Sequence, residues 1–359
     1  MRTRAPGGGR RGTGKICGVA ATLADVAARA GVSSATVSRV LNGNYPVAEG
    51  TRARVLAAVA ELHYVVNAHA RALAARTSDV IGVIVNDISD PFFGVMAGGV
   101  QGEAARDDLL AVICSTAGSP EEELRYVRLL LRQRVRCIVL TGGHLEEPGY
   151  LAQLAQLLDH AADAGTAVVL CGRPMMPGTQ AVALDFDDRA GAAEATRHLL
   201  GLGHRRVACV EGPAGNSTAR GRLAGYREAM AEAGLPPQVT EGGFDRESGR
   251  EGALRLLAAG SEGPTAILAA NDLVAFGVLA AARERGLRVP EDLSVVGYDD
   301  ISFAADAFPA LTTVRLPLAE AGAQAGRVAA GLAATPPGTV RTLRPRLVVR
   351  SSTAAPREG

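Results

Sequence analysis

A short polar segment near the N-terminus carries side chains suited to reading DNA bases. In TLADVAARAGVSSATVSRVLN (22–42), Ser34, Ala35 and Arg39 share one expected helix. An arginine can donate two hydrogen bonds to guanine, whereas small residues make one hydrogen bond or touch a thymine methyl group. Other polar side chains of the segment suit phosphate oxygens, which position a protein on DNA without specifying sequence: Thr22, Ser33, Thr36, Ser38 and Asn42.

A helix-turn-helix is the element that would position these side chains. Ala27 is small where two helices would meet, and Gly31 tolerates the positive φ of a tight turn. We expect Thr22 to cap the first helix, and Ser33 or Ser34 to cap a second that enters the major groove. A third helix over 51–62 completes the unit, because helices this short do not stand alone. An ordinary helical hairpin is the alternative.

Charge is distributed unevenly along the 359 residues. Residues 1–77 hold 11 of the 38 basic side chains but only three of the 37 acidic ones. A basic head on an acidic body indicates a polyanionic partner for the head, although a solvated basic face is the alternative. Residues 1–20 are rich in Gly and Arg without periodicity. We interpret them as a disordered basic arm.

The remainder of the chain alternates between short β-branched runs and Ala/Leu-rich stretches. Helices are expected at 94–106, 121–133, 189–201, 220–233 and 274–285. Continuous apolar strands separated by helices are typical of parallel sheets covered on both faces. The number of runs favours two doubly wound α/β lobes over one. The expected strands are Val80–Val85, Leu110–Cys114, Cys137–Leu140, Ala167–Leu170, Val182–Leu184, Val207–Val210, Ala266–Ala269, Leu293–Val296 and Leu347–Val349.

Residues 22–353 resemble the LacI (lactose-repressor) family of bacterial transcriptional regulators. The resemblance begins with DVAARAGVSSATVSRVLNG and TRARVLAAVAELHYVVNAHARALA. It continues through IGVIVNDISDPFF (81–93), GHRRVACVEGP (203–213), RLAGYREAM (222–230), AANDLVAFG (269–277), LRVPEDLSVVGYDD (287–300) and LTTVRLP (311–317). It implies a helix-turn-helix headpiece, a core like that of periplasmic binding proteins, and a homodimer that binds palindromic operator DNA, usually as a repressor.

The resemblance also implies a hinge helix within 67–74 that orders on DNA. Leu73 matches a leucine that wedges into the minor groove, where an apolar side chain unstacks a base step. Asn67, His69 and Arg71 would lie near the DNA backbone. By itself, Leu73 would more often be a core residue. Ala48 stands where relatives usually place a serine that caps the third helix, which predicts a lost cap worth about 1 kcal/mol.

Between the lobes the family binds a small effector, and ligands of open α/β sheets gather at the carboxyl ends of parallel strands. We expect Phe92 and Phe93 to stack on a flat ring or sugar face, and Arg222 with Asp272 to bind a polyol, base or carboxylated metabolite. The candidate effector residues are Asp90, Phe92, Phe93, Arg173, Asn216, Thr218, Arg222, Phe244 and Asp272.

Each of these assignments has a structural alternative. Arg222 could form a salt bridge, Asp272 could cap a helix, and Phe93 could belong to the core. Two departures from the family pattern bear on the ligand: Gly172 stands where many sugar-binding relatives have Asp, and Asp90 replaces a common Asn. A sugar or related metabolite remains the expected effector, with a carbohydrate as the family's default.

Other classes of protein fit the sequence less well. No H-E-x-x-H, G-x-S-x-G or magnesium-binding loop occurs, so no enzyme activity, cofactor or metal is expected. His204, which precedes a strand, is interpreted as structural. A periplasmic solute-binding protein would share the two lobes, but the basic N-terminal residues are not followed by the apolar run of an export signal. Five cysteines without a C-x-x-C pair suit reduced thiols in the cytoplasm. We expect the protein there, associated with the nucleoid.

The predicted organisation has five parts. They are a basic arm (1–20), a DNA-binding domain (21–66), a hinge helix and linker (67–78), a two-lobed effector and dimerisation domain (79–353) and a tail (354–359). No leucine heptad follows the last strand, which favours dimers over tetramers.

Overall fold

The computed structural model describes residues 21–42, 45–64, 78–333 and 335–357. They belong to two compact units, one before and one after the segment 65–77, and each is described by itself. The basic arm (1–20), the hinge positions Asn67–Leu73 and the end of the tail lie outside these residues.

The N-terminal unit contains three helices around a small apolar core. They are α1 (Leu23–Ala30), α2 (Ser34–Asn42) and α3 (Glu49–Glu61). Gly31 ends α1 with a φ of 64°, as the turn requires. The buried core includes Val26, Ala27, Val37 and Val55. The small side chain at Ala27 therefore lies inside the unit, as the helix-turn-helix pattern predicted.

The helix caps in this unit are those that the sequence predicted. Thr22 and Asp25 form a capping box, in which the Thr22 side chain accepts from the Asp25 N–H and the Asp25 carboxylate accepts from the Thr22 N–H. Ser33 Oγ accepts from the Thr36 N–H at 3.2 Å, ahead of α2. Ala48 precedes α3 without a side-chain cap, which confirms the predicted loss.

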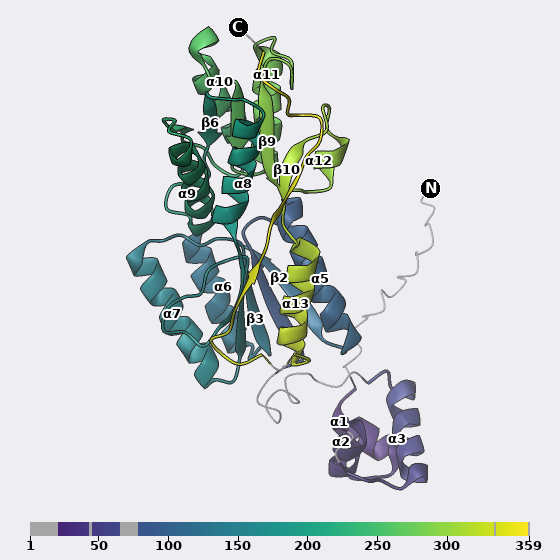
Figure 1. Ribbon diagram of the computed structural model, residues 1–359. Coiled ribbons are helices and arrows are strands. Elements are labelled where there is room, and N and C mark those ends of the chain that lie inside the picture. The colour runs from purple at the N-terminus through teal and green to yellow at the C-terminus, as the bar shows by residue number, and fades with distance from the viewer. Residues whose placement is uncertain (1–20, 43–44, 65–77, 334, 358–359) are drawn as a thin grey trace, which may run out of the picture. The chain divides into compact units, whose positions relative to one another are not determined.

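Lobe 1 of the C-terminal unit is built on a parallel sheet of order β11-β5-β4-β3-β1-β2. Helices α5 (Pro91–Arg106) and α13 (Leu318–Ala330) pack side by side on one face, with α6 (Pro120–Arg132) and α7 (Pro148–Asp163) on the other (Figure 1). The strands are β1 (Val80–Val85), β2 (Leu110–Ser115), β3 (Cys137–Thr141), β4 (Ala167–Cys171), β5 (Val182–Phe186) and β11 (Val340–Leu343).

Lobe 2 repeats the plan with the order β12-β10-β9-β8-β6-β7, in which only β12 is antiparallel to its neighbour. Its strands are β6 (Val207–Val210), β7 (Gln238–Thr240), β8 (Ala266–Ala269), β9 (Ser294–Asp299), β10 (Thr312–Arg315) and β12 (Arg346–Val348). Its helices are α8 (Asp188–Gly201), α9 (Ser217–Glu232), α10 (Arg246–Leu257), α11 (Asp272–Glu284) and the short α12 (Phe303–Asp306). A 3₁₀ turn covers Gly260–Glu262.

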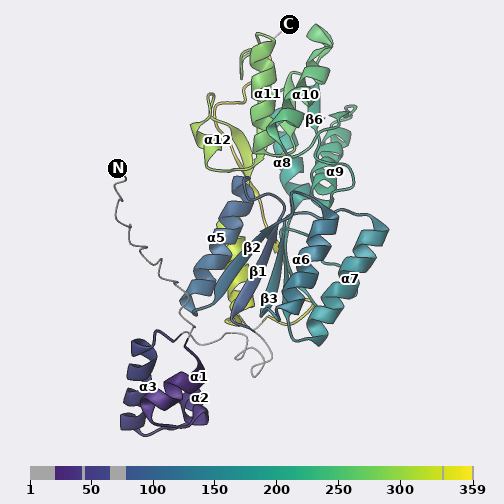
Figure 2. The same ribbon diagram turned by 180° about the vertical axis from the view of Figure 1, so that it is seen from behind.

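Three crossings join the two lobes. The chain passes between them at 186–188, 315–318 and 343–346. Both views show α9 of lobe 2 over α7 of lobe 1, to one side of the crossings (Figures 1 and 2). Because the central strands of each sheet are parallel, their carboxyl ends and the helix N-termini that follow them gather at one edge.

All nine expected strands occur, and several further elements were not predicted. The helices that were not predicted are α7, α10, α13 and the four-residue α12. β9 runs three residues beyond the predicted Val296, to Asp299. This extension places an acidic side chain at the end of a central strand.

None of the helices in the described residues has the length and apolar character needed to span a bilayer.

Candidate functional site

One side of α2 is exposed to solvent. Ser34, Ala35 and Arg39 are exposed, while Val37 and Val40 on the opposite side are buried. The three side chains predicted to face base edges therefore share the solvent-facing side of one helix. The Arg39 guanidinium lies 5.7 Å from the ring centroid of the exposed Tyr45, a cation–π distance that leaves its N–H donors accessible.

The predicted phosphate contacts have different local roles. Thr22 and Ser33 are exposed but already accept from backbone N–H groups as helix caps. The Ser33 and Thr36 hydroxyls are 2.9 Å apart. Ser38 is half-buried on α2, and Asn42 ends that helix. Asn67, His69, Arg71 and Leu73, which the family resemblance assigned to the hinge, lie outside the described residues.

In the C-terminal unit, Arg222 is the centre of a buried charged cluster. Its Nε donates to Asp188 at 2.8 Å, its Nη2 to Asp299 at 2.9 Å and its Nη1 to the Ala270 carbonyl at 2.6 Å. The guanidinium also stacks on Tyr298, 3.9 Å from the ring centroid. Although burial disfavours the charged form, the Asp299 and Asp188 carboxylates raise the pKa of Arg222. The cluster therefore holds a permanent cation between two carboxyl groups.

Asp188 and Asp299 were not among the predicted site residues. Asp188 begins α8, and Asp299 ends β9, so both lie where ligands of parallel sheets gather. Burial raises the pKa of each carboxyl, and Arg222 opposes that shift. The sequence did carry a signal for Asp299, because Gly297-Tyr298-Asp299-Asp300 directly follows an apolar run.

Asp272, which was expected to bind the effector together with Arg222, is committed to the fold instead. Asp272 is 1% exposed, and its two carboxylate oxygens accept from Thr313 Oγ1 at 2.6 Å and from the Ile301 N–H at 2.8 Å. The alternative of helix capping is also wrong, since Asn271 is the cap of α11 and accepts from the Val274 N–H. Asp272 instead ties α11 to the segments that follow β9 and form β10.

Arg173 is also committed to the fold. It is fully buried, and its two Nη atoms donate to the two carboxylate oxygens of Glu123 at 3.0 and 3.1 Å. Its Nε donates to the Gly142 carbonyl at 2.7 Å, and Nη2 also donates to Thr141. With no exposed surface, Arg173 does not contact a ligand directly in this conformation. The prediction is corrected to a role in holding the segment after β3.

The predicted aromatic residues lie against glycines. Phe92 and Phe93 are each 8% exposed and meet edge to face, with centroids 4.9 Å apart. Phe93 leaves no room for a side chain at Gly142, and Phe244 leaves none at Gly212. Phe93 therefore belongs mainly to the core, as the alternative reading held. The half-buried Phe244 accepts from Asn271 Nδ2 through its carbonyl.

Three predicted polar residues keep partial exposure near the Arg222 cluster. Asp90 caps α5 by accepting from the Phe92 N–H, and Asn216 caps α9. Burial raises the pKa of Asp90, whereas Arg222 lowers it. Since Asp90 belongs to lobe 1 and Arg222 to lobe 2, the two lobes bring their charges within electrostatic reach. Thr218 follows Asn216 in the first turn of α9.

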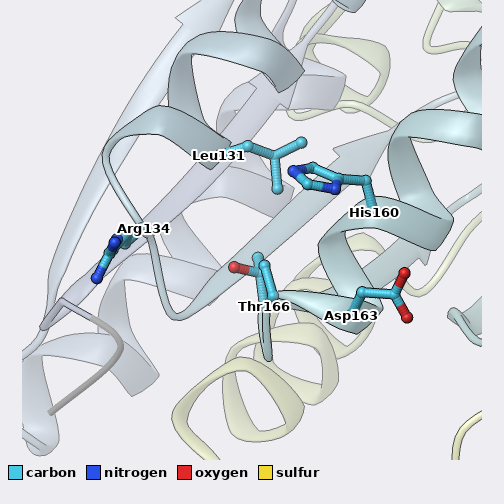
Figure 3. A pocket seen from close by; sticks show the side chains of 6 residues that line it. Leu131, Arg134, His160, Asp163 and Thr166 are labelled. Atoms are coloured by element: carbon cyan, nitrogen blue, oxygen red, sulfur yellow. The ribbon is translucent and has the colours of Figure 1, made fainter.

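A surface pocket of about 430 Å³ lies elsewhere on lobe 1 (Figure 3). Arg134 lies on the far side of it from His160 and Asp163. The lining residues come from the ends of α6 and α7 and from Thr166, just before β4. This is the amino end of the strands, opposite the edge at which ligands of open α/β sheets bind. The Arg222 cluster is therefore the stronger candidate for a ligand site.

His204 has a structural role, as predicted. Its Nδ1 lies 2.9 Å from Thr265 Oγ1, and its Nε2 lies 3.1 Å from Ser294 Oγ and 2.9 Å from the Ala354 carbonyl. These contacts join the start of β6 to β9 and to the last described segment of the chain.

Each of the two units matches the model of a known protein family. Residues 22–67 match the model of bacterial regulatory proteins of the lacI family, and residues 196–353 match the periplasmic binding protein-like domain. The chain is 37% identical over 340 residues to the HTH-type transcriptional regulator DegA of Bacillus subtilis, covering 93% of this chain and 98% of that protein.

Two solved structures extend the similarity to the whole fold. A lac repressor dimer bound to operator and the anti-inducer ONPF aligns with a TM-score of 0.78 and 30% identity, covering 93% of this chain and 99% of that one. A complex of the transcriptional regulator CelR with cellobiose aligns with a TM-score of 0.67 and 34% identity, covering 92% and 99%.

Proposed function

The chain belongs to the LacI family of bacterial transcriptional regulators, and on this premise we propose which of its residues read DNA, which bind the effector and how two copies associate. As a member of that family it is a DNA-binding regulator under effector control, and it is not an enzyme. It acts in the cytoplasm on nucleoid DNA.

α2 is the recognition helix, and one observation carries this proposal: Ser34, Ala35 and Arg39 are exposed on one side of a helix whose other side is buried. A helix of this kind enters the major groove with its N-terminal side chains against base edges. Arg39 reads guanine, while Thr22, Ser33, Thr36, Ser38 and Asn42 lie near phosphates. Asn67, His69, Arg71 and Leu73 contribute the hinge contacts.

The effector binds beside the Arg222 cluster. Arg222, Asp90 and Thr218 supply polar groups, while Phe92, Phe93, Phe244 and Asn216 shape the surroundings. Buried carboxylates and a fixed guanidinium suit the hydroxyl groups of a carbohydrate, since each hydroxyl can donate to one and accept from the other. Cellobiose in the related CelR complex supports the same class of ligand.

A second copy of the chain covers an exposed apolar surface on lobe 2. Phe308 is 98% exposed and Phe303 58% exposed. They line a hollow of about 370 Å³ with Phe276 and Leu279, flanked by Arg246 and Arg283. Exposed aromatic clusters with charged rims are typical of protein interfaces. The dimeric state of the related lac repressor supports a homodimer here.

The regulator proposal is tested by in vitro selection of duplexes from a random library on the full-length protein. We expect enrichment of one palindromic sequence, and a binding constant for it that falls steeply with salt because phosphate contacts release counterions. Calorimetry with a panel of mono- and disaccharides tests the effector class. Failure to enrich any duplex would contradict the DNA-binding assignment for α2.

A further inference from the structure

The two lobes also contact each other directly, away from the three crossings. In this contact, called the clasp below, the segment after β3 (142–146) in lobe 1 meets the loop and first turn of α9 (215–220) in lobe 2. The Ser217 N–H donates to the His144 carbonyl at 3.0 Å, and the Glu146 N–H donates to the Gly215 carbonyl at 2.7 Å. Between them, Leu145 and Asn216 form an isolated antiparallel bridge.

An ion pair closes the outer edge of this clasp. Arg220 Nε and Nη2 donate to the two carboxylate oxygens of Glu146 at 2.6 and 2.7 Å. Such two-point Arg–carboxylate geometry is the most directional form of ion pair. Arg220 is 67% exposed and Glu146 27% exposed, so the pair can separate into water when the lobes part.

Tight packing and a buried network hold the lobe 1 side of the clasp in place. A side chain at Gly143 would meet Thr218 Oγ1 at 2.6 Å and Asn216 Oδ1 at 2.7 Å, so only glycine permits this approach. The neighbouring Gly142 carbonyl accepts from Arg173, whose guanidinium is fixed by Glu123. Arg173, first predicted as an effector ligand, thereby positions the clasp.

The closed arrangement also carries a cost. His144 is 7% exposed, and its buried Nδ1 has no hydrogen-bond partner among the described residues. An unpartnered buried polar atom disfavours the state that contains it. The ion pair and the two backbone hydrogen bonds favour closure, whereas this unpartnered atom opposes it.

We propose that Glu146 and Arg220 form an inter-lobe latch that sets the balance between closed and open lobes and so positions Arg222 for the effector. Arg220 lies two residues before Arg222 on α9, so movement of this first turn also moves the charged cluster. The regulatory part of this inference rests on the proposed function, whereas the latch itself does not.

Hydrogen exchange on the full-length dimer tests the latch without any ligand. The Glu146 and Ser217 amides donate across the lobes, so they exchange when the clasp opens. We expect Glu146→Arg to speed their exchange roughly three- to tenfold, because attraction is replaced by repulsion. Adding Arg220→Glu should restore slow exchange. The matched control is Glu232→Arg. Glu232 lies on α9, the helix of Arg220, but its two-point ion pair is with Arg197 of α8, within lobe 2. This control should leave the exchange of the Glu146 and Ser217 amides unchanged. Equal exchange in Glu146→Arg and wild type, or no rescue by the swap, would overturn the latch.

The regulatory part is tested with the duplex that in vitro selection recovers on the wild-type protein. Glu146→Arg should change its dissociation constant at least about threefold, and the double swap should return it, since coupling between sites of this kind commonly amounts to ~5–150-fold. Unchanged affinity, together with faster exchange, would overturn the regulatory role and leave the latch standing. If the wild-type protein enriches no duplex, the proposed function is contradicted. The existence of the latch is then tested by the hydrogen-exchange rates of the Glu146 and Ser217 amides alone.

Discussion

The Arg222 guanidinium donates to Asp299 at 2.9 Å at the carboxyl end of the second lobe's sheet. Both side chains are nearly buried, and Asp188 shares the same cation. A buried pair contributes little compared with apolar packing, but removal of one partner leaves an uncompensated charge.

Arg222→Met should therefore destabilise the C-terminal unit by about 3–5 kcal/mol, because Asp188 and Asp299 lose their cation. Urea unfolding followed by circular dichroism measures the change. Arg197→Met, which removes an exposed pair on the neighbouring helix, should cost at most about 1 kcal/mol. Equal losses in the two variants would mean that the cluster is not a buried charge network.

Arg39→Ala should weaken binding to the selected operator by about 1–3 kcal/mol and relax the preference at one base pair. The thermal unfolding temperature should stay the same, because Arg39 is exposed. Fluorescence anisotropy with the operator and with single-base variants measures both effects. Arg205→Ala, an exposed arginine of lobe 2, is the control and should bind like wild type.

Ala48→Ser should stabilise the N-terminal unit by about 0.5–2 kcal/mol, because α3 has no side-chain cap. Hydrogen exchange of the α3 amides reports the gain. Ala57→Ser in the exposed middle of the same helix should instead destabilise it by a few tenths of a kcal/mol. Stabilisation by both serines, or by neither, would argue against a capping effect.

The pH dependence of stability should include a contribution from Asp272. Burial raises the pKa of this carboxyl from 3.8 to about 7 in the folded protein. Between these values the folded state holds a proton that the unfolded state has lost, so stability falls as the pH rises from about 4 to 7. Asp272→Asn removes this contribution.

The difference in unfolding free energy between wild type and Asp272→Asn should therefore shrink with rising pH over that interval. The variant keeps one side-chain oxygen that can accept from the Ile301 N–H, and loss of the second acceptor, which serves Thr313 Oγ1, adds a constant cost. Denaturant unfolding at pH 4, 5.5 and 7 measures the difference, and a gap that stays constant would contradict the raised pKa.

Phe308→Glu should weaken the homodimer, because the charge would be buried against the second copy. Sedimentation velocity over a dilution series measures the shift towards monomer. Val349→Glu, another exposed apolar position of the same unit, tests whether the effect is local. Unaltered dimers in the Phe308 variant would place the interface elsewhere, and a tetramer in wild type would contradict the prediction from the missing heptad.

The sequence by itself determined the nine expected strands, the two α/β lobes and the helix-turn-helix. These depend on local periodicity and turn chemistry, such as the apolar spacing of α1 and the positive φ of Gly31. The exposed positions on α2 follow from the same rule, since one face of a short helix must be buried. Local spacing does not determine the partners of buried charges.

Only the tertiary structure decided those partners. Asp272 accepts hydrogen bonds from Thr313 and Ile301. Arg173 donates to Glu123, and Arg222 donates to Asp188 and Asp299. The residues in each set are 29–77 positions apart in the chain. A buried charge must find a counter-charge or hydrogen-bond partner wherever the packed elements bring one. That depends on the order of the strands in each sheet, such as β10-β9-β8 in lobe 2, rather than on any local pattern.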